Sequence, residues 1–378
     1  MTTKNSEKTL VVVQLTGGND FMNTIVPYTN SHYYDARKKI VLGQDDFLPI
    51  NDTLAINKNA APFKRMFDEG NMAIIQGIGY PNSNRSHFRG MDIWHTCEPD
   101  RVGNEGWLGL AVREIDPRGE NVLTGVNIGQ GLPRAMAVAG VPVTSISDLE
   151  GYGVMKRLEQ EQLRDKALQA FKDIYGQAIG SGVVAEYIGK TGLDVLRGAD
   201  MLSEVAENYN STVEYADNSI AKSLRDVARI HLSGLGTRIF YTNHGGYDTH
   251  ANEMPAHPKL ISDLSGAISD FIDDLEEHEA ADDVAILVFT EFGRRMRDNG
   301  SGTDHGSGGG AFLFGKNVKG GLYSDYPSLD PANWEHSEDL QHTIDFRGIY
   351  GTVLQQWLEI EAKPIVKGDF EQISPFYL

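Results

Sequence analysis

A carboxylate and an imidazole lie close together in the sequence at two places, each time in a glycine-rich stretch. Asp304 and His305 belong to the run TDHGSGGG, and Asp248 and His250 belong to GGYDTH. Glycine lets the backbone turn tightly, so both side chains of a pair can reach one centre. Carboxylate oxygen and imidazole nitrogen are common ligands of divalent metal ions. We therefore expect a metal site here, with a simple polar turn as the alternative.

A third carboxylate, Asp20, follows the apolar run of residues 9–15 in the sequence TGGND. In open α/β sheets, ligands bind beyond the carboxyl ends of the strands, and Asp20 has this position. The alternative is a strand-to-helix turn in which Asp20 only caps a helix. Asp248 and Asp304 also follow apolar runs, which favours one shared site.

A candidate nucleophile lies in the run NSNRSHF. Ser86, or Ser83 before it, would stand at the start of a helix over residues 86–96, where free N–H groups and the helix dipole favour an anion. Such a serine could attack a phosphate or sulfate ester, with Arg85 or Arg89 as a clamp on the anion. The alternative is that the serine only caps the helix.

Cys97 is the only cysteine, so an intrachain disulfide is excluded. It begins the string CEPDR, which matches the C-x-P-x-R pattern in which sulfatases convert cysteine into formylglycine. A formylglycine sulfatase is therefore an alternative hypothesis. Cys97 follows the predicted helix of residues 86–96 and does not open it, and three fixed positions match readily by chance.

Short apolar runs predict the strands that must position these residues: 9–15, 72–78, 123–128, 237–243, 284–289 and 311–314. Residues 135–138 are a further short β-like piece. Helical periodicity predicts helices at 62–69, 86–96 and 260–278, and a last one ending near 358. The helix between strands 237–243 and 284–289 indicates a βαβ crossover and parallel strands. Residues 155–235 are mostly helical in pattern, so we predict one domain over residues 1–378, with a helical insertion or cap at 151–235.

The composition is that of a folded globular protein, with 40% hydrophobic and 23% charged residues. No apolar run approaches the length of a membrane span, so we expect a soluble protein without a membrane partner. The net charge of −19 argues against nucleic-acid binding, because there is no basic stripe to displace counterions from phosphates. An anionic substrate would need local cations, either basic side chains or metal.

The polar lead of residues 1–8 runs directly into an apolar strand and leaves no room for a signal peptide. This predicts a cytoplasmic protein. The alternative is a periplasmic or exported protein whose leader has been removed.

Six motifs spread over nearly the whole chain carry a family resemblance: LVVVQLTGGNDFMNTIVPY, IIQGIGYPNSNRSHF, NEGWLG, GGYDTH, TEFGRRMRDNGSGTDHG and TIDFR. They resemble the bacterial family called domain of unknown function 1501, a branch of the alkaline phosphatase and sulfatase superfamily. The resemblance implies an α/β fold, a doubly wound and mostly parallel sheet sandwiched by helices, with metal ligands on strand-end loops. It implies two metal ions, with Asp20, Asp304 and His305 at one and Asp248 and His250 at the other.

The resemblance also implies that Ser86 takes the place of the nucleophile. Alkaline phosphatases space the aspartate and histidine by four residues, whereas His250 follows Asp248 by two. Just upstream of the TDHG run, Glu291 and Arg294 are predicted to support the ligands.

These residues predict a hydrolase of phosphate or sulfate esters that depends on a divalent metal (Zn, Mn, Mg or Ca). Its substrate would be a small anionic molecule or a sugar ester. The alternative is a non-catalytic, metal-stabilised binding or assembly protein, which the spacing of Asp248 and His250 motivates.

Overall fold

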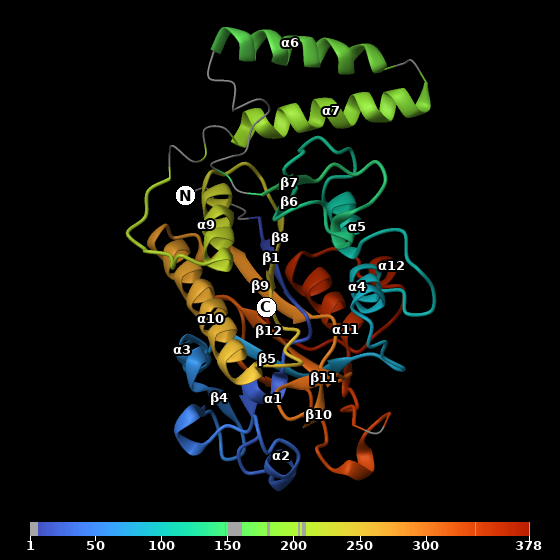
Figure 1. Ribbon diagram of the computed structural model, residues 1–378. Coiled ribbons are helices and arrows are strands. Elements are labelled where there is room, and N and C mark those ends of the chain that lie inside the picture. The colour runs from blue at the N-terminus through green and yellow to red at the C-terminus, as the bar shows by residue number, and fades with distance from the viewer. Residues whose placement is uncertain are drawn as a thin grey trace.

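The computed structural model describes residues 7–147, 149, 161–179, 182–202, 205, 209–336 and 338–377. Its centre is one large sheet with the strand order β13-β5-β12-β9-β1-β8-β6-β7, and β14 pairs with β5 (Figure 1). The strands are β1 (Thr9–Thr16), β5 (Met72–Gly79), β6 (Gly125–Ile128), β7 (Thr144–Ile146), β8 (Ile239–Gly245), β9 (Val284–Thr290), β12 (Gly309–Phe314), β13 (Gly321–Tyr323) and β14 (Ile344–Asp345). Only β12 runs antiparallel to its neighbours, which are β5 and β9. The predicted, mostly parallel sheet is confirmed.

The strands are apolar throughout because both faces of the sheet are covered. In β1, Val11, Val13 and Leu15 pack into the core on one face, whereas Leu10 and Val12 pack into the core on the other. Successive residues of a strand point to opposite faces, so two separate cores form around one sheet. This explains why the strands could be recognised as short, unbroken apolar runs.

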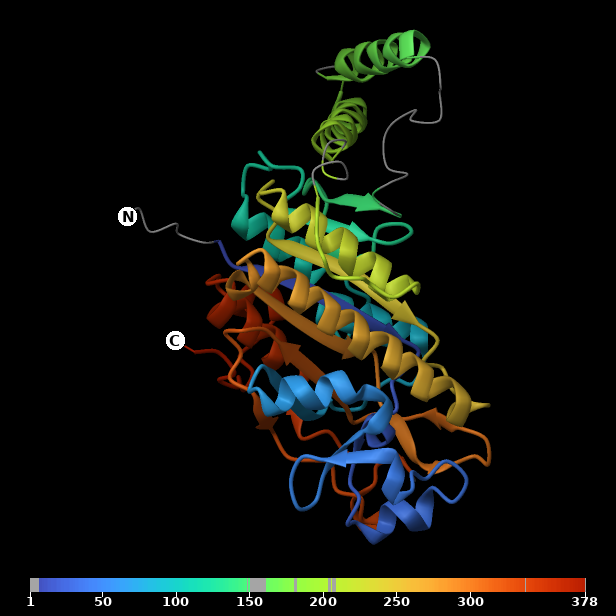
Figure 2. The same cartoon turned by 90° about the vertical axis from the view of Figure 1, so that its left-hand side faces the viewer.

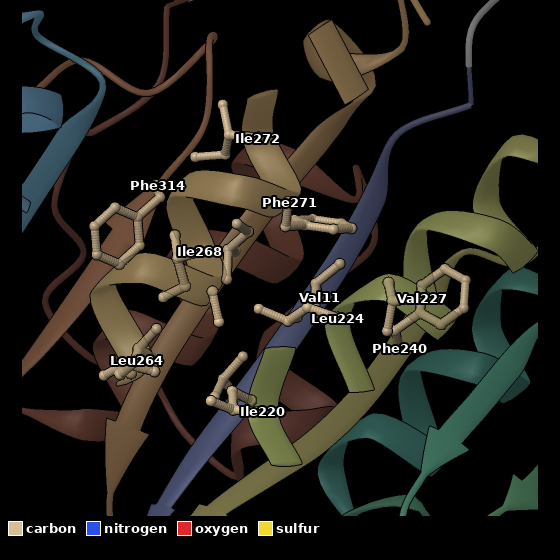
Figure 3. Close-up of a cluster of buried hydrophobic side chains, with 14 of the residues drawn as sticks. Val11, Ile220, Leu224, Val227, Phe240, Leu264, Ile268, Phe271, Ile272 and Phe314 are labelled. Carbon is tan, nitrogen blue, oxygen red and sulfur yellow. The ribbon is translucent and has the colours of Figure 1, made fainter. Parts of the chain in front are cut away.

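Helices cover both faces of the sheet, as a doubly wound fold requires. On one face lie α3 (Ala61–Asp68), α9 (Ser219–Leu232) and α10 (Glu253–Glu277), and on the other lie α4 (His87–Thr96), α5 (Trp107–Ile115) and α11 (Phe346–Thr352). Figure 3 shows the first core, where Leu224 of α9 and Ile268 of α10 point toward Val11 of β1. A π-helical turn (Val353–Trp357) continues α11, and α12 is Lys363–Val366.

Smaller elements surround the lower edge of the sheet in Figure 1. β10 (Arg294–Asp298) and β11 (Thr303–His305) form an antiparallel hairpin, and β2 (Ile25–Val26), β4 (Ala55–Asn57) and β3 (Phe47–Pro49) form a second small sheet. Two short helices, α1 (Phe21–Thr24) and α2 (Ser31–Ala36), lie in the same region. The hairpin follows β9 directly and carries Asp304 and His305 on β11.

The predicted βαβ unit is present as β8, α10 and β9, but β1 lies between the two strands and pairs with both. The helical pair α6 (Glu161–Ala178) and α7 (Val183–Leu202) projects from the layered body in both views (Figures 1 and 2). These helices fall in the predicted 151–235 insertion, whereas α9, also in that range, packs on the sheet. The predicted helical start at 155–160 lies outside the described residues. Within the described ranges, no helix is long and apolar enough to cross a membrane.

Candidate metal centre

The loops that carry the predicted ligands begin at one edge of the sheet. In the register of β1, Leu15 pairs with Thr290 of β9 and Thr16 pairs with Gly245 of β8. The strands are parallel, so their carboxyl ends meet at this edge. The loop after β8 carries Asp248 and His250, and the hairpin after β9 brings β11 against that loop.

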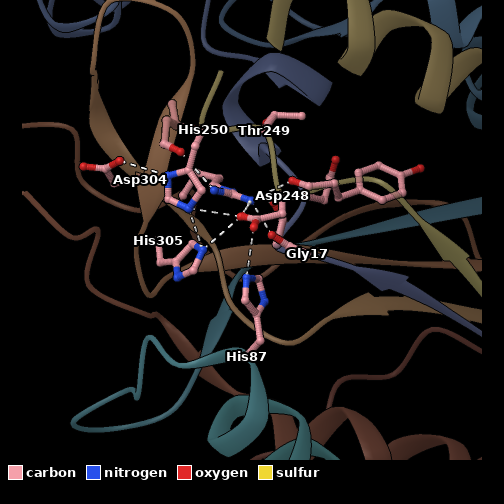
Figure 4. Close-up of polar contacts among 12 residues, drawn as sticks. Gly17, His87, Asp248, Thr249, His250, Asp304 and His305 are labelled. Atoms are coloured by element: carbon pink, nitrogen blue, oxygen red, sulfur yellow. Dashed lines mark hydrogen bonds and ion pairs between the residues drawn. The ribbon is translucent and has the colours of Figure 1, made fainter. Parts of the chain in front are cut away.

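Three imidazole rings surround the carboxylate of Asp248 (Figure 4). Their Nε2 atoms lie near its oxygens, at 2.9 Å for His305, 3.1 Å for His250 and 3.3 Å for His87. The Nε2 atoms of His250 and His305 are 2.8 Å apart. Four side chains from three segments of the chain therefore direct nitrogen or oxygen atoms toward one another.

The other ring nitrogen, Nδ1, of each imidazole is hydrogen-bonded to an oxygen of the protein. The acceptors are Asp304 Oδ1 for His250 at 3.0 Å, the Arg85 carbonyl for His305 at 2.7 Å and Glu291 Oε1 for His87 at 2.9 Å. A carbonyl or an ionised carboxylate can only accept, so the proton of a neutral ring lies on Nδ1. The Nε2 lone pairs are then left facing Asp248.

This arrangement fits a divalent cation. Nitrogen lone pairs 2.8 Å apart repel each other, and Nε2 of His87 is a buried atom without a hydrogen-bond partner. A proton can bridge two of these atoms, whereas a metal ion can accept all of them, and imidazole held through Nδ1 is the usual form of a metal-bound histidine. Ligand atoms of His87, Asp248 and His305 all lie within 4.8 Å of one another, as a three-residue metal site requires.

The charges of the cluster also suit a cation. Burial raises the pKa of Asp248, but the adjacent His305 ring and the Arg294 guanidinium outweigh it and hold this pKa well below its usual range. Burial lowers the pKa of His305, which favours the neutral ring. The hydrogen bond to Glu291 raises the pKa of His87. The cluster thus offers an ionised carboxylate beside imidazole nitrogens.

Arg294 and Glu291 support the cluster from behind. The buried guanidinium of Arg294 donates to Asp248 Oδ1 at 2.8 Å and to the carbonyls of Tyr247 at 2.7 Å and Thr303 at 2.9 Å. It also donates to carbonyls of the loop after β1. Glu291, fully buried, accepts from the backbone N–H of Gly17 at 2.8 Å and so anchors His87 to the same loop.

Two predicted ligands have different positions. Asp304 lies behind His250, bonded to its Nδ1, and faces away from Asp248 (Figure 4). Asp20 is not in the cluster, because its buried carboxylate is ion-paired with Arg37. No second group of this kind occurs among the described residues, so the second ion implied by the resemblance has no ligand set there.

The structure brings Ser86 and Arg85 next to the cluster but not Arg89. Ser86 is the N-cap of α4, directly before His87, and its exposed side chain makes no capping hydrogen bond. Arg85 Nη1 lies 3.7 Å from Asp339 Oδ1. Arg89 is bound by Asp92 and by the carbonyls of Glu98 and Pro99, near the other end of the helix.

Cys97 lies at that other end of α4, where it is the C-cap in a left-handed conformation with φ 61°. A ten-residue helix is about 15 Å long, so Cys97 and His87 lie far apart. The thiol is buried in the core between α4, α5 and the sheet. The structure therefore gives no support to a formylglycine at this position.

Sequence reasoning missed His87. Its signal was present, since His87 opens a helix that follows the end of β5, just as the other residues of the cluster follow β8 and β9. Only the fold shows that the start of α4 reaches the loop after β8.

Remote likenesses to solved structures are found at low sequence identity. A protein of the alkaline phosphatase superfamily from Vibrio parahaemolyticus is 11% identical, with a TM-score of 0.40 and coverage of 99% of this chain and 71% of the other. The PsFucS1 sulfatase from Pseudoalteromonas sp. is 12% identical, with a TM-score of 0.40 and coverage of 97% and 71%. The lipoteichoic acid synthase LtaP from Listeria monocytogenes is 6% identical, with a TM-score of 0.39 and coverage of 94% and 73%.

At these identities and TM-scores, the likeness says nothing of activity or substrate. No curated protein matches the chain. A family model does match, over residues 79–365, and its description is protein of unknown function (DUF1501). This range holds more than half of the chain and includes His87, Asp248, His250 and His305. The chain is a member of the DUF1501 family.

Proposed function

We propose that this protein is a metal-dependent hydrolase of phosphate or sulfate esters. One observation carries the proposal: the Nε2 atoms of His87, His250 and His305 face the carboxylate of Asp248, and each Nδ1 is hydrogen-bonded to the protein. These four residues would hold one divalent ion, which is a revision of the two ions implied by the family resemblance. When bound, such an ion polarises an ester oxygen and stabilises the charge that develops on it.

Ser86 is the proposed nucleophile, as the sequence also predicts. Its exposed hydroxyl precedes His87 by one residue and is not used for helix capping. In the proposed reaction, Oγ of Ser86 forms a bond to phosphorus or sulfur while the ester bond breaks. The serine proton passes to the leaving oxygen, and water then hydrolyses the seryl ester.

Arg85 is the proposed anion clamp. Its side chain is 37% exposed, and its Nη1 lies 3.7 Å from Asp339, too far for a hydrogen bond, so its guanidinium has a donor left for a substrate anion. The chain carries a net charge of −19, so such a local cation is needed to attract an anionic ester. The substrate class would be a small anionic molecule or a sugar ester.

The test is metal analysis of the purified protein together with turnover. We expect about one ion of Zn, Mn, Mg or Ca per chain, and hydrolysis of p-nitrophenyl phosphate or p-nitrocatechol sulfate after reconstitution. Ser86→Ala should remove turnover without removing the metal, whereas Ser83→Ala, the matched control in the same loop, should keep both. A protein that binds none of these ions and hydrolyses neither ester would rule the proposal out.

A second candidate is a non-catalytic protein in which the metal only stabilises the loops. The dense backbone contacts of Arg294 around the cluster favour it, because they make the same residues part of the architecture. His305→Ala distinguishes the two functions. A structural ion predicts a large loss of thermal stability, and a catalytic ion predicts a folded protein without turnover.

A further inference from the structure

Three of the four proposed ligands, Asp248, His250 and His305, lie on two segments that are distant in sequence, and these segments must keep a fixed separation. Asp248 and His250 flank Thr249, and His305 lies two residues after Thr303. The backbone N–H of Thr303 donates to the carbonyl of Thr249 at 3.1 Å. The two threonines therefore mark the place where the ligand-bearing segments touch.

Glu253, the first residue of α10, binds both threonines through one carboxylate oxygen. Its Oε2 accepts from the Thr303 hydroxyl at 2.8 Å and from the Thr249 hydroxyl at 3.2 Å. Its backbone N–H donates to the Ser301 carbonyl at 3.0 Å, just before β11. Glu253 is fully buried, and its other oxygen, Oε1, accepts from the Asn23 amide at 3.4 Å, so both oxygens are hydrogen-bonded inside the protein.

The two segments are also in close backbone contact where Glu253 binds them. A Cβ atom built on Gly302 would lie 2.0 Å from the Thr249 carbonyl oxygen, so the chains are already in close contact. On the opposite side, Arg294 binds the carbonyls of Tyr247 and Thr303. A small displacement of Thr249 against Thr303 would move Asp248 and His250 relative to His305.

We propose that Glu253 is a positioning residue for the metal centre: it sets the separation of the Asp248–His250 loop and β11 through Thr249 and Thr303. This inference rests on the proposed function, since it assumes that the cluster binds a metal ion. Burying a carboxyl group costs free energy unless its hydrogen bonds are satisfied, and here the hydrogen bonds go to the neighbours of the ligands. Loss of such a supporting partner typically weakens metal binding about 10–100-fold.

The experiment measures Zn²⁺ affinity and the visible spectrum of bound Co²⁺ in folded variants of the full chain. Glu253→Ala, and separately the double change Thr249→Val with Thr303→Val, should raise the Kd about 10–100-fold and alter the Co²⁺ spectrum. Glu253→Gln should restore both, because its amide oxygen can still accept from the two hydroxyls. The valine pair is the informative variant if Glu253→Ala does not fold.

The matched control is Asp274→Asn. Asp274 is also fully buried on α10 and accepts from two hydroxyl groups, those of Tyr209 and Tyr215, but it lies remote from the metal ligands in sequence and contacts none of them. It should lower stability and leave the Kd and the Co²⁺ spectrum unchanged.

Two results would overturn the inference, and they differ in what else they overturn. Wild-type affinity in the valine pair and in folded Glu253→Ala would refute the role of Glu253 alone. A wild-type protein that binds neither Zn²⁺ nor Co²⁺ would refute the proposed function, and the inference with it.

Discussion

Two clusters of ionisable side chains lie close together at the edge of the sheet, and they differ in how exposed they are to solvent. In the metal-centre cluster, the side chains of Asp248 and His305 are 45% and 20% exposed. In the second cluster, which we call the Asp20 cluster and which consists of Asp20, Arg37, Glu253 and His257, both members of the Asp20–Arg37 ion pair are fully buried. Both clusters combine carboxylate and imidazole behind strand ends.

The clusters also differ in their partners. The Arg37 guanidinium pairs with Asp20 and donates to the carbonyls of Met296 and Arg295, so its charge is fully used inside the protein. His257 Nε2 lies 3.0 Å from the side chain of Asn19. In the metal-centre cluster, Nε2 of His87 has no hydrogen-bond partner. Each cluster has a buried arginine beside its aspartate. The Asp20 cluster is distinguished by a fully buried carboxylate, whereas the candidate site has a partly exposed carboxylate that faces imidazole nitrogens.

The largest effect should come from removing a proposed ligand of the metal-centre cluster. We expect His305→Ala to weaken Zn²⁺ binding by more than about 100-fold, beyond the usual cost of losing a supporting residue, and to lower ester hydrolysis in parallel. Calorimetric titration with Zn²⁺ measures the first, and a chromogenic ester measures the second. His231→Ala is the control, since His231 lies on α9. Unchanged affinity in His305→Ala would show that the two clusters do not differ in this way.

Breaking the Asp20 cluster should instead lower the stability of the fold. We expect Arg37→Ala to lower the free energy of unfolding by about 3–5 kcal/mol, because it leaves the buried carboxylate of Asp20 without its counter-charge. Metal stoichiometry should stay at the wild-type value. Denaturant unfolding and metal analysis of the same sample check both statements. A stable Asp20→Asn variant that has lost its metal would instead make Asp20 a ligand and remove the distinction.

A third prediction concerns the pH dependence of the Asp20 cluster. Burial and the adjacent charge of Asp20 raise the pKa of Glu253 well above its ordinary 4.5. The folded state then binds one proton more than the unfolded state, so the stability from Glu253 is complete below pH 4.5 and is lost as the pH rises toward the higher folded pKa. Compared with Glu253→Gln, the wild type should lose at most about 1.4 kcal/mol per pH unit.

Chemical denaturation of metal-free protein between pH 5 and pH 9 measures this difference. The free energy of unfolding of the wild type, relative to that of Glu253→Gln, should fall steadily as the pH rises. A constant difference would mean that Glu253 titrates normally and that the cluster is not closed to water.

Much of the fold could be predicted from the sequence, because strands that are covered on both faces consist of unbroken runs of apolar residues. The predicted strands 9–15 and 284–289 differ from β1 and β9 by one residue at the end. The start of α10 was wrong by seven residues, since Pro255 and Pro258 hide the helix that begins at Glu253. Pro255 lies in the first turn, where a missing N–H costs nothing. The apolar piece at 135–138, expected to be β-like, is largely a 3₁₀ turn, Arg134–Met136.

The candidate site could be predicted only in part, because it depends on contacts between distant segments. Residue type and strand-end position indicated Asp248, His250 and His305, which the structure places together. The same signals do not distinguish Asp20, whose partner Arg37 is 17 residues away. Nor do they show that Asp304 is hydrogen-bonded to Nδ1 of His250, the ring nitrogen that faces away from Asp248. These differences come from side-chain direction and strand order, which the local pattern does not contain.

The smallest effect is expected at Cys97, a buried ionisable group that belongs to neither cluster. Burial raises the pKa of its thiol well above the usual range, so the thiol stays protonated and unreactive in the folded protein. We expect Cys97→Ala to keep wild-type turnover and to lose about 1 kcal/mol of stability, as is common for a single substitution. Kinetics, and alkylation of native against unfolded protein, measure this. Lost turnover in a folded Cys97→Ala variant, or a formylglycine mass at this position, would mean that the chemistry lies at the other end of α4, and that the cluster around Asp248 only stabilises the loops.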